Sequence, residues 1–240
     1  MGTFIRSTRV KVPTIRNRGS AMSENSHSPR AERRWTASAF VLVSMAVPFL
    51  LPASYSPGTA WLLPAIEGCV LAALIVVDPG RIDRPGTWVR ALSVALVVVI
   101  AAGAAWGAAR LVWELLHGSP QATVATDLLV SGALVWVQTV LAFAFLYWEL
   151  DGGGPVNRHL RPRVHPDLAF PQQLESELAA PGWRPVFADY LFLALTNATT
   201  FGPADVLPLA RWAKLTMAVQ SLLSVVILGL VVANAVNLLN

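Results

Sequence analysis

The chain has 240 residues, of which 55% are hydrophobic and only 13% are charged. Because soluble domains average about 25% charged residues, this composition excludes an ordinary soluble domain and indicates a protein of the lipid bilayer. The net charge of +4 does not indicate a nucleic-acid partner, because the basic residues flank apolar segments instead of forming one binding surface. Cys69 is the single cysteine, so no disulfide can form within one chain.

Residues 1–34 form the first segment and carry eight Lys and Arg residues among Ser, Asn and Pro. The segment lacks an apolar run, which predicts a disordered basic tail rather than a secretory signal.

Five apolar segments follow, and each predicts a transmembrane helix, because a single span in lipid must satisfy its own backbone polar groups. Three of them lie within residues 35–118. A helix of thirty residues, such as the third segment, measures about 45 Å, which exceeds the hydrocarbon core of about 30 Å. The segments cover approximately residues 36–52, 60–77, 87–116, 125–150 and 209–239.

A polar, Pro-rich stretch, residues 151–184, separates the fourth apolar segment from the fifth. It predicts little regular structure beyond one short amphipathic helix near residues 172–180. The apolar segment that comes next, residues 186–198, is too short to cross a bilayer, so we expect a re-entrant helix or a core helix. Pro185 suits the first turn of such a helix, where no N–H is needed.

Residues 189–208 read DYLFLALTNATTFGPADVLP. An acidic residue opens the short helix, a threonine pair and a glycine follow it, and a second acidic residue and a proline come before the last apolar segment. The positions in this pattern are Asp189, Thr199, Thr200, Gly202, Asp205 and Pro208. The layout resembles the pore helix, selectivity filter and inner helix of the tetrameric potassium-channel superfamily, over residues 186–239.

The resemblance implies a pore-like unit in residues 125–240. In it, residues 125–150 are an outer helix, 151–184 a polar loop, 185–208 a pore helix with its filter-like loop, and 209–239 an inner helix. It also implies a homotetramer in which each chain supplies a quarter of the filter, with the first three helices as a peripheral cover. The filter-like loop comprises Thr199, Thr200, Phe201, Gly202, Pro203, Ala204 and Asp205.

The filter-like loop departs from the potassium-channel pattern where the chemistry is most demanding. Potassium filters aim rings of backbone carbonyls at the ion, and glycine permits the unusual φ values this needs. Gly202 keeps the first such position, but Ala204 stands at the second, where a left-handed conformation costs about 1–2 kcal/mol. Pro203 fixes φ and removes an N–H, and Phe201 adds bulk.

We therefore expect a weakly selective cation channel with one or two ion sites near Thr199, Thr200 and Gly202. A monovalent cation is the one ligand expected, and no other cofactor. The sequence leaves open a non-conducting membrane scaffold or sensor that keeps the pore fold. No paired carboxylates, zinc-ligand spacing or Ser/Lys dyad predict an enzyme or a metal site.

A polar stripe follows the last apolar segment. Thr216, Gln220, Ser224 and Asn234 fall within about 80° on a helical wheel. Two interpretations remain open: the stripe lines a watery pore, or its side chains form hydrogen bonds between helices.

Three ionisable residues, Glu67, Arg110 and Glu114, lie inside apolar segments. Charges inside a membrane normally find a partner, so we expect Arg110 to contact Glu67, Glu114 or both. A packing ion pair is the favoured role, and an ion or proton relay is the alternative.

The basic residues are distributed very unevenly about the apolar segments. If four crossings precede the short helix, all 18 except Arg110 lie on one side. Basic loops favour the cytoplasm, which predicts a multi-pass protein of the cell membrane with a cytoplasmic amino terminus. The filter-like loop would then also face the cytoplasm, opposite to ordinary potassium channels. Either the protein is inverted relative to that family or the number of crossings differs by one.

Overall fold

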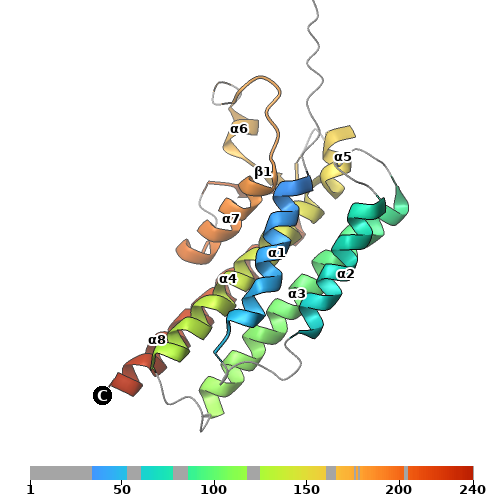
Figure 1. Cartoon of the computed structure of the whole chain (residues 1–240). Helices are drawn as coiled ribbons and strands as arrows, with labels where there is room; N and C mark the ends of the chain where they lie inside the picture. The colour runs from blue at the N-terminus through green and yellow to red at the C-terminus, as the bar shows by residue number, and fades with distance from the viewer. Residues whose placement is uncertain are drawn as a thin grey trace, which may run out of the picture. The chain divides into compact units, whose positions relative to one another are not determined.

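Helices make up almost all of the part of the chain that the computed structural model describes, which is residues 34–52, 61–77, 86–117, 125–160, 166–175, 177, 179–202 and 205–239. These residues belong to one compact unit, Ala31–Asn240 (Figure 1). The predicted basic tail, except Arg34, and Pro203 and Ala204 of the filter-like loop lie outside the described residues.

The helices, one 3₁₀ turn and two short strands follow each other in a simple order. They are α1 (Arg34–Leu50), α2 (Leu62–Val77), α3 (Thr87–His117), α4 (Ala125–Leu150), η1 (Asp151–Gly153), α5 (Pro155–Leu160), β1 (Leu168–Ala169), α6 (Pro171–Leu174), α7 (Phe187–Thr200), β2 (Leu207–Pro208) and α8 (Arg211–Leu239).

Three of these helices, α3, α4 and α8, are long and apolar enough to cross a membrane. With 31, 26 and 29 residues, each exceeds the roughly 20 residues that a crossing needs. By contrast, α1 and α2 have 17 and 16 residues, or about 25 Å of helix each. The chain is thus an all-α membrane protein, as the composition predicts, while five crossings remain a prediction.

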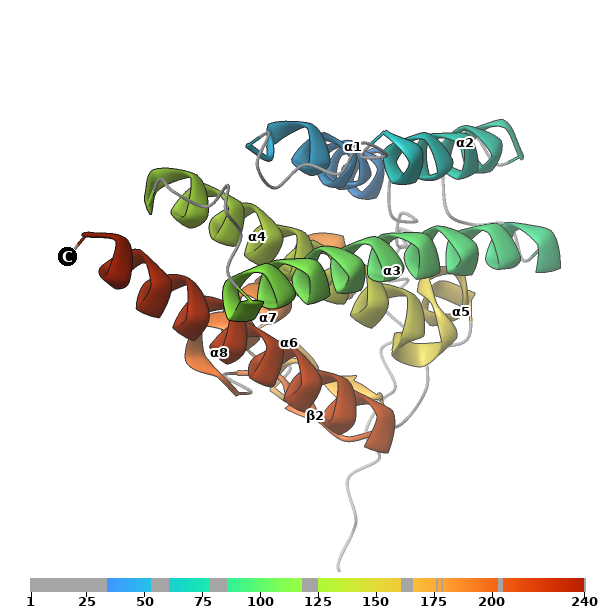
Figure 2. The ribbon, with the colours of Figure 1, turned by 90° about the horizontal axis from the view of Figure 1, so that it is seen from below.

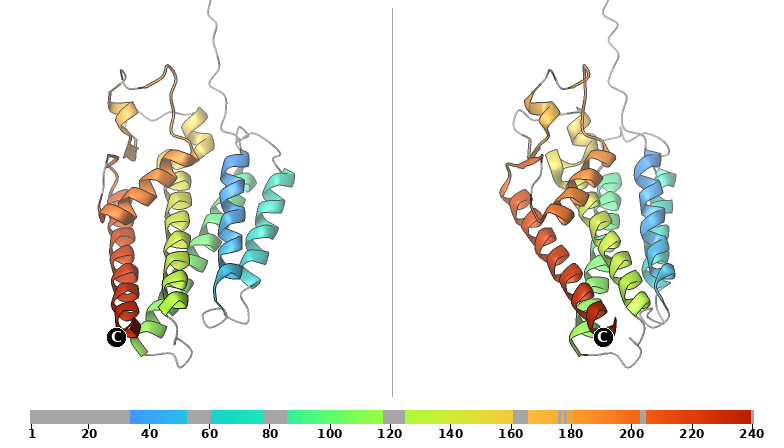
Figure 3. Two further views of the ribbon diagram at one scale, coloured as in Figure 1. Left: turned by 60° about the vertical axis from the view of Figure 1, so that its left-hand side comes forward. Right: turned by 90° about the vertical axis from the view of Figure 1, so that its left-hand side faces the viewer.

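The long helices run antiparallel around α4, which packs against α1, α3, α7 and α8. The hairpin of α1 and α2 lies along one flank and α8 along the other (Figure 2). The amino-terminal ends of α1, α3 and α8 and the carboxyl-terminal end of α4 lie at the same end of the bundle as α5 and α6 (Figure 3). We call it the basic end, because among the described side chains it carries Arg90, Arg158, Arg184, Arg211 and Lys214.

Aromatic side chains fix the start of α7 against α1 and α4. Phe187, the first residue of α7, is fully buried. Its ring centroid lies 4.5 Å from that of Phe145, 5.2 Å from that of Phe40 and 5.8 Å from that of Trp148. Buried aromatic rings contribute large apolar areas and add pair energies of about 0.5–1.5 kcal/mol, so this cluster anchors the amino-terminal end of α7 at the basic end.

Near the other end, α4 and α8 approach each other at a glycine. A Cβ atom placed on Gly132 would lie 2.5 Å from Cγ2 of Val231 and 3.2 Å from its Cβ. Only glycine fits here, since valine has little rotamer freedom in a helix. This contact sets the distance between α4 and α8.

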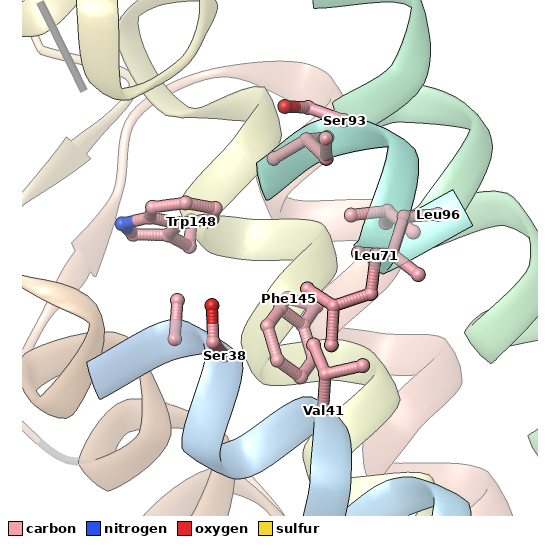
Figure 4. Close-up of a pocket in the computed structure, with 10 residues that line it drawn as sticks. Ser38, Val41, Leu71, Ser93, Leu96, Phe145 and Trp148 are labelled. Atoms are coloured by element: carbon pink, nitrogen blue, oxygen red, sulfur yellow. The ribbon is translucent and has the colours of Figure 1, made fainter. Parts of the chain in front are cut away.

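A small cavity of about 30 Å³ lies among α1, α2, α3 and α4. Figure 4 shows apolar side chains around it, with the hydroxyl groups of Ser38 and Ser93 as its polar part. This volume holds one or two water molecules, so the cavity is no ligand site.

Candidate functional site

The short helix α7 begins beside the carboxyl-terminal end of α4 and is capped by an acidic residue. Asp189 accepts a hydrogen bond from the backbone N–H of Val186 through Oδ2, at 2.7 Å. A negative charge in the first turn also suits the positive end of the helix dipole. Burial raises the pKa of Asp189 above its usual range, and the hydrogen bond from Val186 opposes part of that rise. The predicted opening acid is therefore a helix cap.

The far end of α7 reaches well into the bundle. Asn197 Nδ2 donates to the carbonyl oxygen of Met217 at 3.0 Å and to Oε1 of Gln220 at 2.8 Å. Gln220 is nine residues beyond Arg211, where α8 begins. At 1.5 Å per residue, Asn197, near the end of α7, therefore lies beside a point about 14 Å from the start of α8.

The chain then returns to the end from which α7 started. β2, just before α8, pairs antiparallel with β1 in the register Leu168 to Pro208 and Ala169 to Leu207. The N–H of Leu168 in turn donates to Oδ1 of Asp151, directly after α4, at 3.3 Å. α7 and its return segment thus enter and leave at the basic end (Figure 3).

Gln220 joins three helices at the point where α7 ends. Its Oε1 accepts from the hydroxyl of Tyr147 on α4 at 2.7 Å and from Asn197 on α7. Its Nε2 donates to the carbonyl oxygen of Ala194 at 2.7 Å. Ser221 adds weaker hydrogen bonds to Asn197. Because Gln220, Tyr147 and Asn197 are fully buried, this network holds α7 between α4 and α8.

The network determines where the predicted polar stripe faces. Gln220 and Ser224 are fully buried within the chain, and the hydroxyl of Thr216 and the amide of Asn234 bond to carbonyl oxygens of their own helix. The residues that α8 exposes between Leu215 and Val236 are all apolar or glycine: Leu215, Ala218, Val219, Leu222, Val225, Val226, Gly229, Val232, Ala233 and Val236. For Gln220, hydrogen bonding between helices is therefore the interpretation that the geometry fits.

The threonine pair forms the last turn of α7. Thr199 Oγ1 donates to the carbonyl oxygen of Leu195 at 3.0 Å, and Thr200 Oγ1 donates to those of Thr196 at 2.8 Å and Gly202 at 2.9 Å. Both threonines are exposed. Their hydroxyl groups are thus turned onto the main chain of the same segment.

The unusual backbone conformation in this loop falls on a different residue from the one expected. Phe201 has φ 56° and ψ 31°, in the left-handed region, whereas Gly202 is not among the described residues with positive φ. The expectation that Gly202 adopts the unusual φ of a filter glycine is wrong. The left-handed cap that ends α7 falls on Phe201, one residue before Gly202. Asp205 is exposed, and Pro208 belongs to β2.

A second polar group, which the sequence reading missed, lies where α4 meets α7. The hydroxyl of Tyr190 donates to Oδ2 of the buried Asp151. Arg158 Nη1 donates to the carbonyl oxygens of Trp148 and Asp151, and its guanidinium lies 4.9 Å from the centre of the Tyr190 ring. These bonds satisfy the carboxyl-terminal carbonyls of α4 and tie the polar loop to the bundle.

The three predicted intramembrane ionisable residues separate into two groups. Arg110 Nε donates to Glu114 Oε1 at 2.7 Å, an i to i+4 ion pair on α3. Glu67 on α2 is buried and accepts from the hydroxyl of Ser44 at 3.3 Å, while Gln138 Nε2 donates to Ser44 at 2.8 Å. Arg110 therefore contacts Glu114, whereas the partner of Glu67 in the described part of the chain is Ser44 of α1, which in turn accepts from Gln138 of α4.

Residues 34–239, apart from their undescribed gaps, contain no group of three or more His, Cys, Asp and Glu side chains able to hold a metal ion. No family model matches the chain, and no curated protein and no solved structure shows significant similarity to it. The class is therefore the one that the helices themselves define, an all-α membrane protein.

Proposed function

We propose that the chain is the subunit of a homotetrameric, channel-like protein of the cell membrane, through which monovalent cations pass with weak selectivity. The observation that carries this proposal is the course of α7 and the segment that follows it, which enter and leave the helix bundle at the basic end (Figure 3). α7 ends about 14 Å into the bundle by helix rise, and its carboxyl-terminal turn, with Thr199 and Thr200, is exposed.

The chemistry of this helix end favours cations. The last carbonyl groups of a helix lack partners within it, and the helix dipole places about half a negative charge there. At this depth the surroundings are of low dielectric, where such a partial charge acts more strongly than in water. Weak selectivity follows from Pro203 and Ala204, which do not suit a continuous ring of carbonyl ligands.

Strain at the end of α7 gives further support. A left-handed conformation costs a side-chain-bearing residue about 1–2 kcal/mol, yet Phe201 adopts it while Gly202 stands next in the chain. Residues held in such conformations cluster at functional sites. The exposed apolar face of α8 is a surface on which copies of the chain can pack, and the number four comes from the potassium-channel resemblance.

The basic end supports a cytoplasmic amino terminus. Among the described residues, Arg110 is the one basic side chain inside a long helix away from this end. Basic residues in loops favour the cytoplasmic side, so α7 and its loop would enter the membrane from the cytoplasm.

The test is cation flux into liposomes that contain the purified protein, with the number of subunits determined by native mass spectrometry. We expect potassium and sodium flux of similar size. Thr200→Val should lower the cation flux about tenfold, which corresponds to the free energy of one hydrogen bond. Thr139→Val is the matched control, because that hydroxyl bonds to Val135 within α4. A confirmed tetramer without flux would overturn the proposal.

A specific observation favours the second candidate, a non-conducting membrane scaffold or sensor. The exposed face of α8 is apolar over its whole membrane length, and an apolar constriction excludes ions by dewetting. Leu222→Ser separates the two candidates. Flux should rise if α8 lines a pathway, and a scaffold should stay impermeable with either residue.

A further inference from the structure

A cavity of about 380 Å³ opens between the hairpin of α1 and α2 and the pair α3 and α4. It lies toward the end of the bundle opposite the basic end, because its walls come from the end of α1, the start of α2, the second half of α3 and the first half of α4. The walls are mostly apolar, and the polar residues among them are Arg110, Glu114 and Ser131. Its volume lies within the range of small-molecule sites.

These polar groups have unused hydrogen-bonding capacity. Ser131 is fully buried, and its Oγ has no hydrogen-bond partner among the described residues. Arg110 contacts Glu114 through Nε, and in the described part of the chain no other polar contact to its guanidinium is present. The Oγ of Ser131 is too enclosed to meet a ligand, but Arg110 and Glu114, with side chains 31% and 16% exposed, both line the cavity. The two guanidinium nitrogens that Arg110 does not use toward Glu114 are therefore available to a polar ligand.

The depth of the ion pair indicates a lipid headgroup. Arg110 and Glu114 lie seven and three residues before His117, where α3 ends, or about 10 and 5 Å from that end. Trp106 and Trp113 on the same helix are both 64% exposed. Exposed tryptophans on a membrane helix mark the level of the lipid headgroups.

We propose that this cavity binds a zwitterionic phospholipid with a primary amine headgroup. Its phosphate would accept hydrogen bonds from Arg110, its ammonium group would donate to Glu114, and an acyl chain would cover the apolar walls. The Arg110–Glu114 pair has no net charge, so it matches a headgroup that carries one charge of each sign. An anionic headgroup would meet the Glu114 carboxylate without compensation, and a quaternary ammonium has no N–H to donate.

Two glycines make room for this ligand. Gly103 and Gly107, one turn apart on α3, both line the cavity. A Cβ on Gly107 would meet nothing nearer than Cγ2 of Val135, at 4.0 Å. A larger side chain at Gly107 can therefore enter the cavity without displacing the backbone.

The experiment is a native mass spectrometry titration of the purified protein with phosphatidylethanolamine, phosphatidylcholine and phosphatidylglycerol of identical acyl chains. We expect phosphatidylethanolamine to bind about tenfold more tightly than the other two, as one charge-assisted hydrogen bond provides. Arg110→Gln should weaken binding of all three lipids, because each presents the phosphate that Arg110 contacts, and should keep the preference over phosphatidylcholine that Glu114 provides. Glu114→Gln should reverse it toward phosphatidylglycerol, because the site then carries a net positive charge.

Gly107→Leu should weaken binding of all three lipids by filling the cavity, while Ala105→Leu, on an exposed position of the same helix, should leave it unchanged. Equal binding of the three lipids, or a preference for phosphatidylglycerol in the unsubstituted protein, would overturn the proposal. If the charge variants fail to fold, the wild-type lipid comparison and the Gly107→Leu and Ala105→Leu pair still decide it.

Discussion

The network around Gln220 and the cavity wall around Arg110 show two ways in which apolar helices hold polar side chains. Gln220 is fully buried and bonds to side chains or carbonyls of α4 and α7. Arg110 bonds to Glu114 on its own helix and faces a cavity. Polar groups of the first kind determine how helices pack. Those of the second kind leave the packing free and retain capacity for a ligand.

The largest expected effect is the loss of the three-helix network. Gln220→Ala removes three hydrogen bonds and leaves their partners buried, which should lower the free energy of unfolding by about 3 kcal/mol at about 1 kcal/mol for each bond. Thermal unfolding in detergent, followed by tryptophan fluorescence, measures the change. Asn234→Ala is the control, because that amide bonds to Leu230 of its own helix and should cost less than about 1 kcal/mol. Equal losses in the two variants would show that the network does not hold the helices together.

A second prediction compares two glycine-to-alanine substitutions, one at the contact between α4 and α8 and one in the wall of the cavity. Gly132→Ala places a methyl group against the stiff Val231, and overpacking of this kind should cost about 2 kcal/mol. Gly107→Ala enters open space and should stabilise the helix by up to about 1 kcal/mol. The same unfolding assay measures both. If the two substitutions change stability in the same direction, the cavity is not open in solution.

The smallest effect is expected at the ion pair on α3. Arg110→Gln removes an i to i+4 pair whose side chains are 31% and 16% exposed, and pairs of this kind contribute about 0.3–0.5 kcal/mol. The unfolding midpoint should hardly move, although binding of all three lipids should weaken. A loss above about 2 kcal/mol would place this pair with the Gln220 network, and the contrast between the two regions would fail.

The helices themselves could largely be predicted from the sequence. The expected segments 87–116, 125–150 and 209–239 agree with α3, α4 and α8 within two residues, because long apolar runs bounded by charged or Pro-rich stretches are local signals. The short apolar run 186–198 likewise gives α7. The amphipathic helix expected near residues 172–180 is shorter, Pro171–Leu174.

The partners of the polar side chains could be predicted only where they are local. The Arg110–Glu114 pair follows from its i to i+4 spacing. The contacts of Gln220 with Tyr147 and Asn197, and of Asp151 with Tyr190, depend on how separate helices pack, which no periodicity records. The sequence placed Gln220 and Ser224 on one face but not which neighbour that face meets. Likewise, the left-handed cap at Phe201 depends on where α7 stops.

The antiparallel order of the helices has a consequence for where the chain's ends lie. α1 and α2 run out and back, so they add either no crossing or two, whether or not their 17 and 16 residues span the bilayer. α3 and α4 form a second such return, and α8 remains alone. If α3, α4 and α8 each cross and α7 does not, the total is odd with or without the α1 and α2 hairpin, and reporters fused before α1 and after α8 should then lie in opposite compartments. Two such tags can therefore determine the orientation of the protein in the membrane, whatever the contribution of α1 and α2 to the number of crossings.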